Sequence, residues 1–288
     1  MGALSRSWAW LRRNALNIYA GLAIAYMLIP IVVIAVFSFG ATPKGKLTFG
    51  LNNGFTTEYW TSIFSIEQLN EALLTSLRLA ALSTVAATAI GTAMAIALVR
   101  HQFRGRRAAN LLIVIPMATP EVVIGASLLS MFLIYSFVLG FSTLLIAHVM
   151  FSISFVVIVV RSRLIGFDRN LEEAAADLGA SPLTTFRTVT FPLLAPGVVA
   201  AAMLAFALSI DDFVISNFNS GTTVTFPLYV YGVSLRGIPV QVNAVATLLF
   251  VVAILAAAAV IVQQRRAERM AKAAPEREPI PTGTALTR

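Results

Sequence analysis

The sequence predicts an all-α membrane protein with six transmembrane helices, and three observations lead to that fold class. Of the 288 residues, 58% are hydrophobic and only 12% are charged. A soluble domain of this length carries roughly twice that charge. Several apolar segments reach about 20 residues, which is long enough for a helix to cross a hydrocarbon core of about 30 Å. The chain contains no cysteine, so disulfide bonds, thiolate metal sites and cysteine nucleophiles are excluded.

The apolar segments define six predicted spans in order along the chain. The first is too long for a cleavable signal peptide, and no small-x-small cleavage site follows it. The third contains Pro116 and Pro120, which predicts a kinked or broken helix. The six spans cover residues 18–39, 79–99, about 109–139, 141–160, about 193–217 and 242–262.

Basic residues alternate between the loops and predict the orientation. Arginines cluster before the first span, between the second and third, between the fourth and fifth, and after the sixth. The alternate loops hold only Lys44, Lys46 and Arg236, with Arg78 at the outer end of the second span. The positive-inside rule therefore places both termini in the cytoplasm. This topology explains the formal charge of +8 without a nucleic-acid partner.

The same pattern divides the chain into three parts. Residues 1–17 form a cytoplasmic N-terminal segment, and residues 18–262 form the six-helix transmembrane domain. Residues 263–288 form a cytoplasmic tail that is rich in charge and proline from Ala273 onward. Such a composition cannot bury an apolar core, so the tail is expected to be disordered.

A charged loop at about residues 163–192 separates the fourth and fifth spans. Asp168 can cap a short helix that runs to about Leu178. Glu172 and Glu173 then lie near the positive end of the helix dipole, where acidic side chains are favourable. The first half of the loop is therefore predicted to be a short helix.

The second half of the loop carries the signals of a tight turn and another helix. Gly179 suits the left-handed residue that ends a helix. Ser181 is a good N-cap, and Pro182 fits the first helical position after it. The second helix is predicted to end at about Val189, before Pro192.

The residue spacing in this loop resembles the EAA loop of ABC-importer permeases of the binding-protein-dependent transport type. Glu-Ala-Ala is followed by three residues, a glycine, nine residues and then Val-x-Phe-Pro, where the family usually has Ile and Leu for the Val and Phe. The simpler alternative is a solvated amphipathic connector. The resemblance implies an ATPase-coupling surface made of Glu173, Ala174, Ala175, Gly179, Ala180, Ser181 and Pro182.

The resemblance also implies a set of partners and a location. A permease of this kind has the type I importer fold and pairs with a sister permease, as a heterodimer, in the inner membrane of a prokaryotic cell. A cytoplasmic ABC ATPase dimer binds ATP-Mg, and an extracytoplasmic binding protein delivers the solute. The chain itself has no Gly-x-x-x-x-Gly-Lys-Ser/Thr phosphate loop, so it is expected to be a transport subunit without a cofactor rather than an enzyme.

Three acidic residues fall inside predicted spans, where ionisable groups are costly and indicate function. Glu121 lies in the third span, and Asp211 and Asp212 lie in the fifth. In a continuous helix Ser209, Asp212 and Ser216 would share one face at positions i, i+3 and i+7. That polar stripe is a candidate lining for a substrate pathway.

Each of these residues also has a structural interpretation. Asp211 would point away from the stripe and could form a buried ion pair with Arg78. Asp212 could make a hydrogen bond between helices instead of contacting substrate. Glu121 could cap a broken helix after the second proline. His148, in the fourth span, is expected to be a hydrogen-bonded packing residue.

Carboxylates in a pathway favour a cationic solute over an anion. Aromatic residues in the outer loops could add cation–π contacts to an organic ammonium group, although Tyr and Trp at a membrane boundary are equally common as interface anchors. The residues concerned are Tyr59, Trp60, Tyr229 and Tyr231.

Two further segments narrow the resemblance. Residues 208–214, Leu-Ser-Ile-Asp-Asp-Phe-Val, and residues 242–247, Val-Asn-Ala-Val-Ala-Thr, are similar to the second permease subunit of spermidine/putrescine ABC importers. The likeness extends over about residues 15–265 and implies that Asp212, followed by Asp211 and Glu121, meets the ammonium groups. The alternatives are an ABC permease for another organic cation, iron or thiamine, a proton-coupled secondary transporter, and a purely structural membrane subunit.

Overall fold

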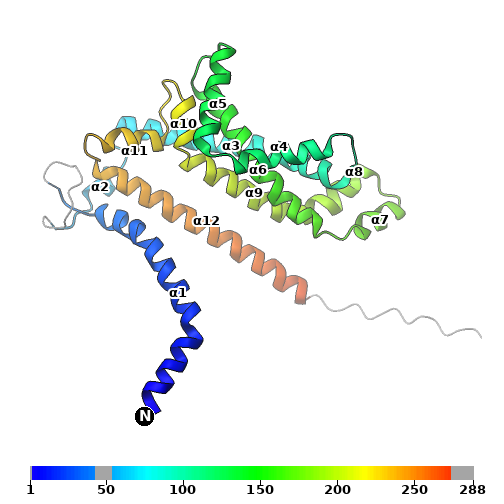
Figure 1. The fold of residues 1–288 in the computed structure, drawn as a ribbon, viewed down its shortest axis with the longest axis horizontal. Helices are drawn as coiled ribbons and strands as arrows, with labels where there is room; N and C mark the ends of the chain where they lie inside the picture. Colours follow the sequence, from blue (N-terminus) through cyan, green and yellow to red (C-terminus); the bar gives the residue numbers. More distant parts are fainter. Residues whose placement is uncertain (1, 43–53, 274–288) are drawn as a thin grey trace, which may run out of the picture.

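The computed structural model describes residues 2–42 and 54–273, and this part of the chain is built from helices (Figure 1). The only β feature among the described residues is an isolated bridge between Gly40 and Phe55. Lys44, Lys46 and the tail from residue 274 lie outside them. The elements are α1 (Gly2–Phe37), α2 (Glu58–Thr61), α3 (Glu67–Arg100), α4 (Arg106–Ala118), α5 (Glu121–Ile134), α6 (Phe141–Ile165), α7 (Asn170–Asp177), α8 (Pro182–Thr185), the π-helical segment η1 (Phe186–Thr190), α9 (Phe191–Asp211), α10 (Val214–Asn219), α11 (Phe226–Ser234) and α12 (Val240–Ala273).

The all-α fold with up to six spans is confirmed. Five helical stretches are long and apolar enough to cross a membrane, and α4 with α5 counts as a sixth span if the bent pair is taken together. The break between α4 and α5 falls at Thr119 and Pro120 and bends the chain by 112°. The kink predicted from the two prolines is therefore a full break, with Pro116 accommodated inside α4 and Pro120 preceding α5.

The fifth span differs from the prediction at both ends. It ends at Asp211, because Asp212 adopts an extended conformation and α10 begins afresh at Val214. At the other end, helix continues from Pro182 through Asp211 without the expected stop before Pro192. The wider turn of η1 immediately precedes α9, and Pro192 sits in the first turn of that helix. Pro192 is tolerated there because a π-helical turn changes the local hydrogen-bond register.

The core of the molecule is formed by α3, α6 and α9, which pack side by side (Figure 1). Small side chains allow these helices to approach closely, as is common between membrane helices. A Cβ atom added at Gly91 of α3 would lie 2.7 Å from Val156 of α6. Buried Ala87, Ala201 and Ala205 continue the same close packing. This three-helix core positions the ends of α9, where both candidate sites lie.

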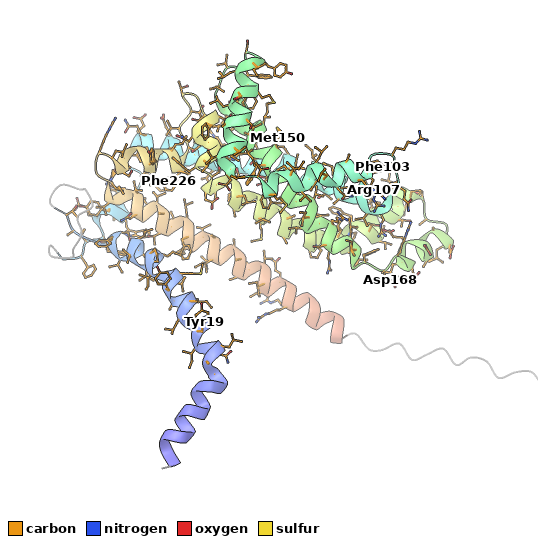
Figure 2. The ribbon with its side chains drawn as sticks, viewed as in Figure 1. Tyr19, Phe103, Arg107, Met150, Asp168 and Phe226 are labelled. Carbon is orange, nitrogen blue, oxygen red and sulfur yellow. The ribbon has the colours of Figure 1, made fainter. Side chains whose placement is uncertain are left out.

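Two helices lie at the periphery. α1 diverges from the rest of the molecule (Figure 1), and none of its most apolar stretch is buried. Figure 2 shows the side chains of α1, including Tyr19, standing clear of the other helices. The most apolar stretch of α12 is only 6% buried. Both helices therefore present wide apolar surfaces, as expected in a bilayer.

Candidate functional site

The charged loop folds into a helical hairpin made of α7 and α8. α7 begins at Asn170, whose N–H donates to Asp168 Oδ1 at 3.0 Å. The turn after α7 contains Gly179 with φ +83°, the left-handed conformation that favours glycine. Ser181 caps α8 by accepting a hydrogen bond from the N–H of Thr184 at 3.3 Å, and Pro182 is the first residue of α8. The predicted helix, turn and helix start are confirmed.

Most of the side chains proposed for ATPase coupling lie on the outside of this hairpin. Glu173, Ala174, Gly179, Ser181 and Pro182 are exposed. Ala175 and Ala180 are half-buried.

Exposed leucines extend the surface that those residues form. Leu178 is 90% exposed and Leu183 is 66% exposed. The hairpin therefore exposes apolar as well as charged side chains near its turn. Neither leucine was among the predicted coupling residues, although both lie close to the Gly179 turn.

Glu172 points inward and was not among the predicted site residues. Its Oε1 accepts hydrogen bonds from Arg100 Nη2 at 3.0 Å and from Thr190 Oγ1 at 2.7 Å. The guanidinium of Arg100 also lies over the ring of Phe167, 5.3 Å from its centroid. The sequence indicates an inward-facing glutamate only through the adjacency of Glu172 and Glu173. Adjacent residues of a helix point about 100° apart, so when Glu173 faces outward Glu172 faces another side.

A second group of polar side chains is buried at the other end of α9. Its centre is His148 of α6, which is 2% exposed. Nδ1 lies 2.8 Å from Ser209 Oγ, and Nε2 lies 3.1 Å from Ser216 Oγ. Ser83 Oγ of α3 lies 2.9 Å from Ser209 Oγ and extends the network to a third helix. The expectation that His148 is a hydrogen-bonded packing residue is confirmed.

Asp212 belongs to the same network. Its carboxylate accepts hydrogen bonds from the N–H groups of Ile215 at 3.2 Å and Ser216 at 2.8 Å, and its Oδ2 lies 3.4 Å from His148 Nε2. The side chain is only 5% exposed. Asp212 therefore caps the start of α10, in the way that Asp commonly caps helices.

The three residues predicted to share a helix face do meet, but for a different reason. A continuous helix through Ser209, Asp212 and Ser216 was wrong, because α9 ends at Asp211. The break returns the chain toward α6, where His148 contacts all three side chains.

The remaining acidic candidates are exposed. Asp211 is the last residue of α9, and no ion pair joins it to Arg78 in the part of the chain that the structure describes, so that predicted pair is wrong. Arg78 instead borders a cavity of about 430 Å³ beside Phe141. Glu121 begins α5 at an exposed position, and its side chain makes no capping hydrogen bond because Pro120 is the capping residue.

The outer aromatic residues are packed against neighbouring elements. The hydroxyl of Tyr59 donates to the carbonyl of Thr42 at 3.2 Å. The indole N–H of Trp60 donates to Ser38 Oγ at 3.2 Å, and its ring stacks on that of Phe39. Burial raises the pKa of the Tyr229 hydroxyl. Tyr231, which is 54% exposed, lies with its ring centroid 4.9 Å from that of Phe213, next to Asp212 in sequence.

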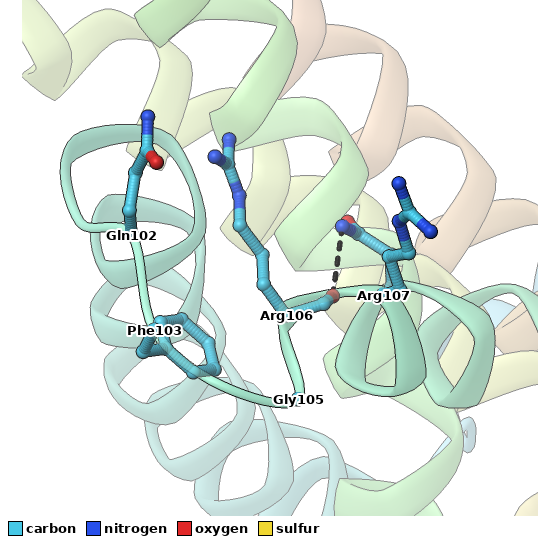
Figure 3. Close-up of a pocket in the computed structure, with 6 residues that line it drawn as sticks. Gln102, Phe103, Gly105, Arg106 and Arg107 are labelled. Carbon is cyan, nitrogen blue, oxygen red and sulfur yellow. Dashed lines mark hydrogen bonds between the residues drawn. The ribbon is translucent and has the colours of Figure 1, made fainter.

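A cavity of about 570 Å³ opens between α3 and α4 at the arginine-rich loop (Figure 3). Asn110 fixes one wall, because it donates to the carbonyl of Arg106 at 3.0 Å and accepts from Arg161 at 2.7 Å. The lining of this cavity includes arginines and no acidic side chain, so the cavity is unsuited to a cation. The lining residues are Gln102, Phe103, Gly105, Arg106, Arg107 and Asn110.

Known proteins match this chain over most of its length. It is 40% identical over 233 residues to the spermidine/putrescine transport system permease protein PotC of Escherichia coli strain K12, which covers 80% of this chain and 86% of that one. It is 34% identical over 236 residues to the putrescine transport system permease protein PotI of the same strain, covering 79% and 83%.

The fold has solved counterparts. One is a bacterial alginate ABC transporter in complex with an alginate pentasaccharide-bound periplasmic protein, with a TM-score of 0.62 at 16% identity, covering 91% of this chain and 98% of that one. Residues 87–271 match the family described as the binding-protein-dependent transport system inner membrane component. The helical bundle, the exposed hairpin and these matches agree, and the chain belongs to that family of ABC-importer permeases.

Proposed function

We propose that this chain is a permease subunit of an ATP-driven importer of polyamines and that it forms half of the translocation pathway. The observation that carries the proposal is the 40% identity to a spermidine/putrescine permease over 80% of the chain. The exposed hairpin of α7 and α8 supports it, because a transporter driven by a separate ATPase needs a surface on which that ATPase can dock.

The partners follow from this proposal. A sister permease completes the pathway, and an extracytoplasmic binding protein delivers the solute. An ATPase dimer holding ATP-Mg docks on the hairpin, with Glu173, Ala174, Gly179 and the exposed Leu178 at the contact. The alternation of basic residues supports a cytoplasmic position for the hairpin and for both termini in a bacterial inner membrane.

The substrate pathway is proposed to run past the outer end of α9. Asp211 and Glu121 are exposed carboxylates that can attract ammonium groups. Asp212 is buried and committed to the cap of α10 and to His148, together with Ser209 and Ser216. In this conformation Asp212 affects a substrate only indirectly, because it holds the start of α10 in place. A direct contact between Asp212 and a substrate requires the hydrogen bonds around His148 to break.

The test is uptake of labelled putrescine and spermidine in cells that express the chain with its neighbouring-gene partners. A matched strain carries an ATPase subunit that cannot hydrolyse ATP. We expect uptake that depends on ATP hydrolysis and is abolished by excess unlabelled polyamine.

The other outcomes identify the alternatives. An assembled complex without polyamine uptake would contradict the substrate and direct the search to other organic cations, iron or thiamine. Uptake that survives loss of the ATPase and collapses with the proton gradient would instead indicate a secondary transporter.

A further inference from the structure

A single carboxylate oxygen joins two segments of the charged loop to a third segment that is 72 residues away in the sequence. Glu172 lies on α7, Arg100 is the last residue of α3, and Thr190 is the last residue of η1, directly before α9. Glu172 Oε1 accepts from both other side chains, at 3.0 Å and 2.7 Å. We call these three residues the Glu172 junction.

The junction is shielded from solvent and partly fixed in place. The side chains of Arg100 and Glu172 are 13% and 20% exposed, and Thr190 is 7% exposed. The Phe167 ring covers the Arg100 guanidinium on one side. A charged hydrogen bond that is screened from water in this way is stronger and more directional than a surface ion pair.

Apart from the junction, α7 has few attachments to the spans. α7 packs mainly against α8 and η1, which belong to the same loop. Its backbone connections pass through Gly166 to Asp168 on one side and through the Gly179 turn on the other. Without the junction, α7 could tilt about these connections when a partner moves it. With the junction, the same displacement is applied to the end of α3 and the beginning of α9.

We propose that Glu172 is the positioning residue that passes movement of the hairpin to the spans α3 and α9. This inference rests on the proposed function, in which an ATPase docks on the outer side of the hairpin. Glu173 and the exposed leucines make the external contact, and Glu172 makes the internal one. The pair of adjacent glutamates thereby links the ATPase to two of the three helices of the core.

Glu172→Gln tests the junction in the full complex, with sister permease, ATPase and binding protein in proteoliposomes. Glutamine keeps the size of the side chain and an acceptor oxygen but removes the charge that pairs with Arg100. We expect ATP hydrolysis to persist while solute transported per ATP falls roughly tenfold, within the range typical of coupling between two sites. Glu71→Gln, an exposed change on α3, is the matched control and should transport like wild type.

The outcomes separate the two proposals. A wild-type complex whose uptake does not depend on the ATPase contradicts the proposed function itself. Wild-type coupling in Glu172→Gln, with ATP-dependent uptake intact, overturns only the junction. Loss of ATPase binding in Glu172→Gln also overturns it, because Glu172 would then belong to the docking contact.

A distance measurement tests the junction without relying on transport. The chain has no cysteine, so Gln102→Cys, two residues after the end of α3, and Asn170→Cys, at the start of α7, give a unique spin-label pair in this subunit. We expect one narrow distance distribution with and without ATP, and a broader one that shifts with ATP when Glu172→Gln is added. Equal distributions in the two proteins would overturn the proposal. Partial recovery by the charge-reversed pair Arg100→Glu with Glu172→Arg would support it further.

Discussion

At the two ends of α9 stand two pairs of adjacent acidic residues, Glu172–Glu173 beside its beginning and Asp211–Asp212 at its end. In each pair one carboxylate is shielded and hydrogen-bonded while its neighbour is exposed. The shielded members differ in their partners. Glu172 is held by side chains of other segments, and Asp212 is held largely by backbone N–H groups three and four residues further along.

The difference shows two ways to satisfy a shielded carboxylate. A local cap needs only an aspartate and the backbone N–H groups of the next few residues, so it stabilises a break such as the one between α9 and α10. A bond to a distant arginine forms only when the fold is complete, so it can report on the relative position of elements. We therefore expect Asp212 to matter most for stability and Glu172 for coupling.

Asp212→Ala should have the largest effect on stability. It leaves the N–H groups of Ile215 and Ser216 and the ring of His148 without their buried acceptor, which costs about 3 kcal/mol. The midpoint of thermal unfolding of the purified complex should fall, and less complex should be recovered from membranes. Asp212→Asn keeps one acceptor oxygen and should lose less. An unchanged midpoint in Asp212→Ala would show that the cap is dispensable.

His148→Leu should rank second, because it removes the partner that Ser209, Ser216 and Asp212 share. Two buried hydroxyls lose a hydrogen bond, and Ser209 keeps only Ser83, so we expect a cost of about 2 kcal/mol. The same thermal unfolding assay measures it. The exposed His101→Leu is the control and should leave the midpoint unchanged. A loss equal to that of Asp212→Ala would mean that the network fails as one unit.

Gly179→Val tests the turn that joins α7 to α8. A Cβ at this position meets no neighbouring atom, so the cost comes from the left-handed backbone alone, about 1–2 kcal/mol. Because the turn is exposed, the hairpin can relieve this strain by rearranging locally, so we expect reduced coupling of ATP hydrolysis to uptake and a smaller fall in the unfolding midpoint than for His148→Leu. Gly179→Asn tolerates the conformation better and should retain more coupling. Equal defects in both variants would point to a side-chain clash with a partner.

The exposed member of each pair should matter least for stability. Asp211→Ala and Glu173→Ala should each change the free energy of unfolding by no more than about 0.5 kcal/mol. Their effects should appear elsewhere, as weaker polyamine uptake for Asp211→Ala and weaker ATPase copurification for Glu173→Ala. A large drop in the unfolding midpoint for either variant would contradict the division into shielded and exposed carboxylates.

Local signals in the sequence accounted for much of the fold and of the hairpin. Apolar length predicted the spans, and the two prolines predicted the interruption of the third. Gly179, Ser181 and Pro182 predicted the turn and the start of α8, because helix caps depend on a few neighbouring residues. The break at Asp212 was missed, since Ser209, Asp212 and Ser216 also fit a continuous helix. The Asp-x-x-Ile-Ser spacing could have been interpreted as a cap.

By itself, the sequence determined that this chain is a helical membrane protein, where its apolar helices run and that a capped hairpin separates two of them, because these depend on length, polarity and nearby residues. Only the tertiary structure decided which carboxylate of each acidic pair is shielded and that Arg78 does not reach Asp211. It also decided that His148 contacts Ser209, Asp212 and Ser216. Those outcomes depend on how α3, α6 and α9 pack. Helical periodicity sets the angle between neighbouring side chains, but it does not say which side meets a partner.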